Sequence, residues 1–586
     1  MPSKVELRND LQSRIDEQLV KIKKICEALD EEYCELAKRC MHLNGVQPIG
    51  MLPPELLVQI FEIDRRCSSS FDKYNWVRLT HVCSHWRAVA HKTPTLWSLV
   101  IISRPIWAKK MLERSTQAPL EVDWEKSSSS WTRWTDSLAF AKRLFTSNSY
   151  RIVVLRVCMG VKDYAEVQAS IPSFFPILRD VSVTVWSLVS GATVEIPTWP
   201  LQSPSIKHIS FWGHWGRLAL SAFAFHDALE SLSFGSLSSC GIIDFQLQSV
   251  LSALTGAPSL RRLTLLDIFG DATQDLSHLP SVHLPRLDSL HIRDPLECCV
   301  WLIKQVIIPP TAEMNIITTA ASDEDIAHLT ITLAEKLNTQ YSLPIIRLLV
   351  VNELSGGVNV DGFTSVDGHH DTGRRFSVII SSSLDTRTVL TAFCHRLPLS
   401  NVRSLELAGM PDNAAFQGTI AAMPYIASLQ LRGACLDSLP ILLKSELEED
   451  DRRPGARHEP PHLMPYLQHL MIAEGYRTRN FSKVCEELKH TLRARGMDRS
   501  LCMTIRFSGC RQFDKADYTA LVSAVAALYD RDITENRSVW IQAADEPPVR
   551  YRDFIWQDDW VKRADNSPSS VDADTVGIAF KLYVEK

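Results

Sequence analysis

From residue 15 to residue 43, apolar side chains recur at alternating spacings of four and three. Such a heptad repeat predicts an amphipathic helix over residues 1–44 whose apolar side must be buried. Two arrangements would bury it: a parallel coiled-coil homodimer, or a helix folded back onto its own chain. We name these positions the heptad face: Ile15, Leu19, Ile22, Cys26, Leu29, Tyr33, Leu36, Cys40 and Leu43.

Two shorter apolar helices are predicted after a joint at residues 44–48. Pro53 and Pro54 fix backbone angles suited to a helix start, and the following residues place four apolar side chains on one face. A polar interruption over residues 67–75 precedes a second apolar stretch, which ends where Pro94 removes a backbone donor.

The segments LPPELLVQIF, LTHVCSHWRAVA and TPTLWS, in this order, resemble an F-box-like domain, here placed at residues 45–102. The resemblance implies a small helical module that docks on the Skp-type adaptor of an SCF ubiquitin ligase. Residues 65–74 are longer and more polar than the tight connection of that family. The adaptor contacts that the resemblance implies are Leu52, Pro53, Leu56, Ile60, Val82, Cys83 and Trp86.

Downstream, one short phrase recurs: an apolar residue, two mostly polar residues, then two apolar residues that flank one position. Each copy predicts a strand with alternating faces. The early copies begin about 23 to 31 residues apart, and residues 245–254 and 296–307 between them predict helices. The phrase occurs at residues 177–183, 206–211, 229–234, 260–265, 287–292, 402–407, 426–431 and 467–472.

This pattern resembles leucine-rich repeats, and it predicts an α/β fold with an irregular strand-helix solenoid over residues 103–510. The asparagine that this family places after the strand is missing. Glycines at 356–357 and the segment 367–371 predict a long loop between residues 344 and 402, and residues 446–462 predict a charged insertion. Residues 511–586 predict a C-terminal cap or tail with a helix at 518–529. An ordinary mixed α/β domain is the alternative.

The polar residues between the core positions of these strands carry both signs of charge, which favours a protein partner over a polyanion. No single target is indicated, so the target-binding residues stay unknown. The residues at these positions are Arg179, Lys207, His208, Glu230, Arg261, Arg262, His291, Arg403, Glu406, Gln468 and His469.

A formal net charge of −5 argues against nucleic acid as a partner. Charged residues stand where a signal peptide needs apolar ones, and no apolar run approaches the length of a membrane span. The 14 cysteines include no CxxC pair, which is typical of reduced thiols. We therefore expect a cytoplasmic or nuclear protein without membrane contact.

Sequence motifs for nucleotide binding, metalloprotease chemistry or a nucleophile elbow are not present in a form that could work. The best metal candidate, the segment 369–371 (His-His-Asp), lacks further ligands at useful spacing. We expect no catalytic residue, no cofactor and no metal site, and hence no enzyme.

The expected function is that of a substrate-recognition subunit. Its partners would be a Skp-type adaptor, through it a cullin scaffold, an unknown protein target, and a second copy of the chain. The alternative is an interaction scaffold outside any ubiquitin ligase, which would use the heptad face and the repeats.

Overall fold

The fold is described from a computed structural model of the chain. The chain divides into two compact units, Met1–Val181 and Ser182–Lys586. The structure describes residues 3–46, 48–67, 73–126, 134–187, 194–197, 199–213, 215, 225–236, 247–269, 281–320, 322–337, 346–354, 357–365, 373–382, 386–408, 420, 422–432, 466–473, 504–508, 537–543, 549–550 and 578–584.

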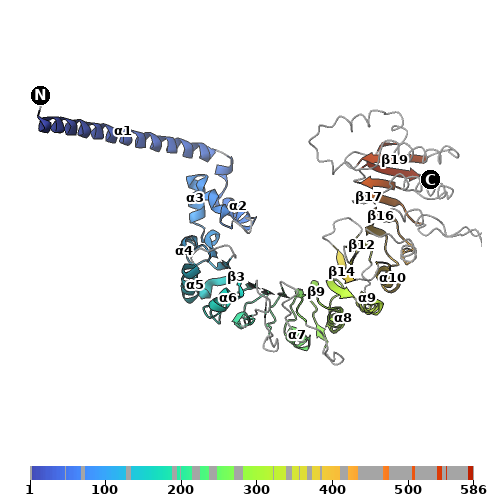
Figure 1. The fold of residues 1–586 in the computed structure, drawn as a ribbon. Helices are drawn as coiled ribbons and strands as arrows, with labels where there is room; N and C mark the ends of the chain where they lie inside the picture. Colours follow the sequence, from blue (N-terminus) through green and yellow to red (C-terminus); the bar gives the residue numbers. More distant parts are fainter. Residues whose placement is uncertain are drawn as a thin grey trace, which may run out of the picture. The chain divides into compact units, whose positions relative to one another are not determined.

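The predicted N-terminal helix is confirmed as α1 (Lys4–Val46), one continuous helix drawn in dark blue in Figure 1. It begins with a capping box, in which the Ser3 amide donates to Glu6 Oε2 (2.7 Å) and the Glu6 amide donates to Ser3 Oγ (3.3 Å). The heptad face is exposed throughout, with Leu29 at 50% and Tyr33 at 61% of full exposure. The folded-back arrangement is therefore not what the structure shows.

The next residues form a small helical module whose interior is aromatic. Phe61 and Trp86 pack with ring centroids 5.3 Å apart, and Trp76 and Trp97 meet edge to face at 4.9 Å. The indole of Trp97 donates to the Ala90 carbonyl at 2.7 Å, which satisfies its buried N–H. The module consists of η1 (Pro48–Met51), α2 (Pro54–Cys67), η2 (Asn75–His81), α3 (Ser84–His91) and η3 (Pro94–Trp97).

Three parallel strands complete the first unit, each followed by a helix. Arg151 holds the connection to the third strand, because its guanidinium donates to Ser115 Oγ (2.9 Å) and the Ala118 carbonyl (2.7 Å). The elements are β1 (Leu99–Ile101), α4 (Pro105–Arg114), β2 (Leu120–Glu125), α5 (Trp134–Asn148), η4 (Ser149–Arg151), β3 (Ile152–Gly160) and α6 (Val161–Gln168). The strand β4 (Asp180–Trp186) contains the point at which the two units divide.

The second unit is built on a large, mainly parallel sheet. Strands β5, β6, β7, β9, β11 and β14 are neighbours in this order, all parallel. Their bounds are β5 (His208–Gly213), β6 (Ser231–Gly235), β7 (Arg262–Leu266), β9 (Ser289–Arg293), β11 (Glu313–Ala320) and β14 (Arg374–Ser382). The smaller elements are η5 (Trp199–Gln202) and the parallel pair β8 (Val282–His283) and β10 (Val306–Ile307).

Helices of the second unit follow one another along one side of the strands (Figure 1). They are α7 (Leu247–Leu254), α8 (Leu296–Gln305), α9 (Asp323–Leu337) and α10 (Thr386–Arg396). Apolar side chains fill the interior in continuous rows, since residues in register on neighbouring strands share one face. One fully buried row contains Ile209, Leu232, Leu263, Leu290 and Met314.

The starts of several parallel strands repeat one backbone arrangement. The Lys207 carbonyl accepts from the amides of Glu230 (2.8 Å) and Ser231 (2.9 Å), and the Glu230 carbonyl accepts from those of Arg261 (2.8 Å) and Arg262 (3.1 Å). The same arrangement recurs where β15 (Ser404–Ala408), β16 (Ser428–Arg432) and β17 (His469–Ala473) begin. The recurring sequence phrase therefore marks a recurring backbone conformation.

The predicted long loop does not extend over residues 344–402, because the described residues of this region are mostly in strands and a helix, while the segment 367–371 lies outside the described residues. This region forms the antiparallel strands β12 (Leu348–Leu354) and β13 (Gly357–Phe363), and β13 also pairs with β14. Gly357, one of the two glycines that suggested a loop, is the first residue of β13. Strand β12 then pairs in parallel with β15, so the parallel order β15, β16, β17 and β18 (Thr504–Ser508) resumes beyond the antiparallel pair.

Strands β19 (Arg537–Ala543), β20 (Val549–Arg550) and β21 (Ile578–Val584) add antiparallel pairings after β18. The expected helix at 518–529 and the charged insertion at 446–462 lie outside the described residues. Within the described part of the chain, no helix is long and apolar enough to cross a membrane.

A buried carboxyl group links two strand ends in the second unit. Asp294, directly after β9, accepts through Oδ1 from the amides of Ile268 and Phe269, both at 2.9 Å. Burial raises the pKa of Asp294 to about 8, and the nearby Asp267 carboxylate acts in the same direction, while Arg293 opposes them. The folded chain therefore retains a proton that the unfolded chain loses near pH 4.

Because Asp294 binds its proton more tightly in the folded state, its contribution to stability falls as pH rises from about 4 to about 8. Asp294→Asn keeps an acceptor and removes the charge. The wild type should lose this contribution between pH 6 and pH 8.5, whereas the uncharged variant should not. We therefore expect the difference in unfolding temperature, variant minus wild type, to increase over this pH range. The free-energy difference should change by at most about 1.4 kcal/mol per pH unit. A difference that stays constant with pH would contradict this assignment.

Candidate docking site

Helix α2 presents one apolar side to the interior of the module and another to solvent. Leu57 and Phe61 are fully buried, whereas Leu56 and Ile60 are 43% and 37% exposed. The prolines at 53 and 54 hold the start of the helix, so the exposed pair stands on a rigid element. Exposed apolar side chains at helical spacing can pack against a partner.

The predicted contact residues do not all lie at the surface. Pro53 is exposed and Leu52 half-buried, while Val82, at the end of η2, is 54% exposed. Trp86 is buried against Phe61, and thus belongs to the core that holds α2 and α3 together.

Cys83 has a local structural role. It stands at the N-cap of α3, where its sulfur accepts a hydrogen bond from the Trp86 amide at 3.5 Å. Its side chain is half-buried, so part of it remains at the surface beside the exposed Val82.

Three exposed apolar residues were missed by sequence reasoning. Ile63 is 60% exposed and follows Ile60 by three residues, which places both on one stripe of α2 with Leu56. Met51 (73%) and Ile49 (49%) lie in η1, just before the prolines. The spacing of Ile63 indicated its position, whereas no periodic pattern marked the two residues in η1.

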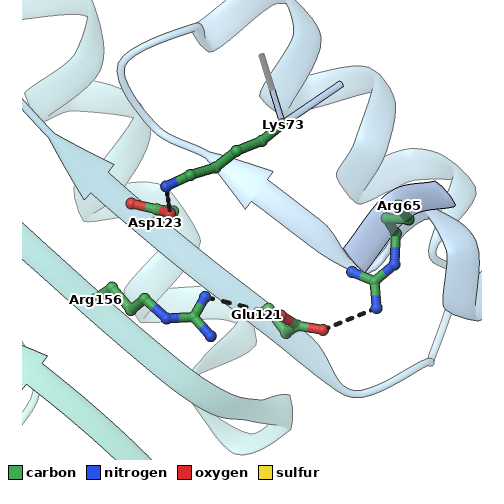
Figure 2. Close-up of polar contacts among 5 residues, drawn as sticks. All are labelled: Arg65, Lys73, Glu121, Asp123 and Arg156. Carbon is green, nitrogen blue, oxygen red and sulfur yellow. Dashed lines mark hydrogen bonds and ion pairs between the residues drawn. The ribbon is translucent and has the colours of Figure 1, made fainter. Parts of the chain in front are cut away.

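Charged side chains tie the module to strand β2 of the same unit (Figure 2). Arg65, at the end of α2, bonds Glu121 at 3.1 Å, and Arg156 from β3 approaches the other oxygen of Glu121 at 3.8 Å. Lys73, just before η2, pairs with Asp123, whose side chain is only 5% exposed. Both carboxylates come from alternate positions of one strand, and therefore point to the same side of it.

Tyr74 adds a third link beside this network. Its hydroxyl oxygen accepts a hydrogen bond from the Ile101 amide of β1 at 2.9 Å. Burial raises the pKa of Tyr74 well above its ordinary value, so the phenol stays neutral across the physiological range. The polar stretch after α2, which departs from the family pattern, is thus the part of the chain that attaches the module to the strands.

Among the described residues, no group of three His, Cys, Asp or Glu side chains is placed to hold a metal ion. The segment 369–371 lies outside those residues. Within residues 49–97, the exposed apolar side chains Leu56, Ile60 and Ile63 form a stripe on α2.

Residues 49–103 match the F-box-like family model. Domains of this family typically bind Skp-type adaptors. The match covers the helical module and β1 and ends before α4. No curated protein matches the chain.

The ion pairs of Figure 2 should hold the module on its strands. Asp123→Asn removes the counter-charge of Lys73 at a buried site, and we expect it to lower the free energy of unfolding by roughly 1 to 3 kcal/mol. The control is Glu113→Gln, which breaks an exposed pair with Lys109 (4.0 Å) and should cost less than about 0.5 kcal/mol. Equal effects of the two substitutions on thermal unfolding would refute this role.

Proposed function

We propose that this chain is a substrate-recognition subunit of an SCF-type ubiquitin ligase. The observation that carries the proposal is the F-box-like match at residues 49–103, together with the exposed stripe of Leu56, Ile60 and Ile63 inside it. The stripe would dock on a Skp-type adaptor, which connects the chain to a cullin scaffold. Residues Leu52, Pro53 and Val82 would border the contact.

The target would bind the second unit. Its repeated strands support an irregular leucine-rich-repeat solenoid, because buried rows and the same strand start recur from strand to strand. The helices cover one side of the strands, so the half-exposed side chains of the other side, such as Ser210, Thr264 and His291, are offered to a protein partner.

Opposite charges already meet where these strands begin. Lys207 pairs with Glu230 at 2.5 Å, and Arg261 lies 3.8 Å from Asp288. These four residues stand at equivalent positions of successive strands. Because the positive and negative charges compensate one another, the surface where these strands begin has no predominant charge. Such a surface suits a target that carries both signs of charge.

The chain would supply proximity and no catalytic residue of its own. Holding a target beside a ubiquitin-charged enzyme raises the effective concentration of the two reactants without new chemistry. The Figure 2 network supports this role, because a module fixed to β2 transmits its orientation to the strands of its own unit.

We also propose that the heptad face pairs two copies of the chain. Nine seam positions on one uninterrupted helix are exposed, and such a surface is stable in water only when covered. This observation also favours the second candidate function, an interaction scaffold that uses the heptad face and the repeats without any ligase. Adaptor binding separates the two functions.

Leu56→Asp combined with Ile60→Asp places two carboxylates on the stripe at exposed positions, so folding should be retained. We expect adaptor co-purification to fall at least about 100-fold, because each contact contributes roughly 1.5 kcal/mol or more. Ile106→Asp on α4, an equally apolar residue that is 68% exposed, is the control and should bind normally. Proteins that co-purify with wild type and with the variant alike are target candidates. Undiminished adaptor binding by the variant would exclude the stripe as the docking surface, whereas a wild-type chain that binds no adaptor would favour the scaffold.

Light scattering at micromolar concentration should give twice the chain mass of 66.1 kDa. Leu29→Asp introduces a charge into the heptad face and should yield a monomer. Val20→Asp is the matched control, since Val20 is 54% exposed but lies outside the heptad face. A monomeric wild type would exclude the pairing while leaving the ligase assignment untouched.

A further inference from the structure

The heptad face contains two rows of different composition along α1. One row is uniformly aliphatic, with Ile or Leu at every position, whereas the other alternates small thiols with larger side chains. The aliphatic row is Ile15, Ile22, Leu29, Leu36 and Leu43, and the mixed row is Leu19, Cys26, Tyr33 and Cys40.

A parallel pair in register would pack each residue against its own copy. Cys26 and Cys40 would each form a thin layer of two thiols, and Tyr33 would form a thick layer of two phenol rings between them. Such uneven layers leave gaps beside the thiols and crowd the tyrosines, and both effects weaken packing.

An antiparallel pair instead packs the mixed row of one helix against the aliphatic row of the other. With Cys26 facing Leu29 of the second copy, Tyr33 faces Ile22 and Cys40 faces Ile15. Every small thiol then meets an aliphatic side chain, so layer volumes even out. Leu19 meets Leu36, and the pairing extends symmetrically over residues 15–40.

Charges beside the heptad face distinguish the same two arrangements. Lys23 and Asp30 lie on one flank of it, seven residues apart. In the antiparallel alignment identical flanks meet, so Lys23 lies beside Asp30 of the second copy, and symmetry creates this ion pair twice. In the parallel alignment opposite flanks meet, which places Lys23 beside Gln18 and Asp30 beside Ile25. Of the two arrangements, only the antiparallel one places opposite charges of the two copies beside each other.

The surface is large enough for a stable dimer. The seam residues of α1 are about half exposed, from 50% at Leu29 to 61% at Tyr33. Removing roughly 90 Å² from each of eight such side chains on both helices buries on the order of 1,400 Å², within the range of specific interfaces.

We propose that α1 pairs with α1 of a second copy in antiparallel orientation, centred between Cys26 and Leu29. This orientation rests on the pairing of two copies proposed above and corrects the parallel arrangement that the heptad pattern first suggests. Each helix leads at its C-terminal end into the F-box-like module. The helix ends at Val46 would be roughly 55 Å apart, at opposite ends of the pair, so two adaptors can dock without collision.

Disulfide mapping in the full-length chain tests the orientation. Two chains are co-expressed, both with Cys26→Ser and Cys34→Ser. One retains Cys40, and the other carries Cys40→Ser with Ile15→Cys. After mild oxidation, peptide mapping should find a link between residues 15 and 40 of different chains. A link between two copies of residue 40 would overturn the proposal, because antiparallel pairing separates them by roughly 37 Å. A dimeric mass with no link between residues 15 and 40 would overturn it as well.

Charge exchange provides an independent measurement. Lys23→Glu should raise the dissociation constant of the dimer about tenfold, because it places a negative charge beside the negatively charged Asp30 of the second copy. Adding Asp30→Lys should restore the affinity. The restoration reports the contact between copies, since the Lys23–Glu27 pair within the helix (4.0 Å) stays broken in both variants. Lys24→Glu, on the outer side of α1, should have no effect. Failure of Asp30→Lys to restore the affinity would exclude this alignment, whereas monomeric wild type would exclude the pairing itself.

Discussion

A single strand of the second unit cannot cover the apolar side chains that it carries, and the rest of that unit follows from this constraint. Leu232 and Leu263 are fully buried only because neighbouring strands hold equivalent residues in the same row. One carbonyl with two amide donors fixes the start of several of these strands, such as β6 and β7, and hence the register of the row. Helices then close one side of the strands, and polar residues are left for the other.

The first unit solves a different problem, the attachment of a small helical module to a sheet. Aromatic packing alone, as between Phe61 and Trp86, would hold the helices of the module together without fixing the orientation of the module relative to the strands. Glu121 and Asp123 add directional contacts, because each carboxylate accepts from a cation on a different segment of the module. The exposed apolar stripe on α2 and strand β2 are therefore held in a fixed relation within that unit.

Short-range patterns predicted much of this architecture. The heptad repeat predicted α1, and the recurring apolar pattern predicted β6, β7, β9 and the equivalent strands β15, β16 and β17. The antiparallel pairing of β12 and β13 was missed because two consecutive glycines in a sequence are equally typical of a loop when the partner strands are unknown. Trp86 was assigned to the surface because spacing alone does not tell which side of a short helix faces the core. The pairing of Lys73 with Asp123 joins residues 50 positions apart, which no local pattern encodes.

The regular rows of buried side chains also influence the order in which the strands of the second unit can form. Buried partners such as Ile209 and Leu232, Leu232 and Leu263, or Leu263 and Leu290 are separated by 23, 31 and 27 residues. Each strand therefore closes only a modest chain loop onto the one before it, and the entropy cost of each closure stays small. Such a sheet can grow in chain order from strands already formed, as nearest-neighbour architectures do. A growing chain would accordingly bury each new row while the next strand is still being synthesised.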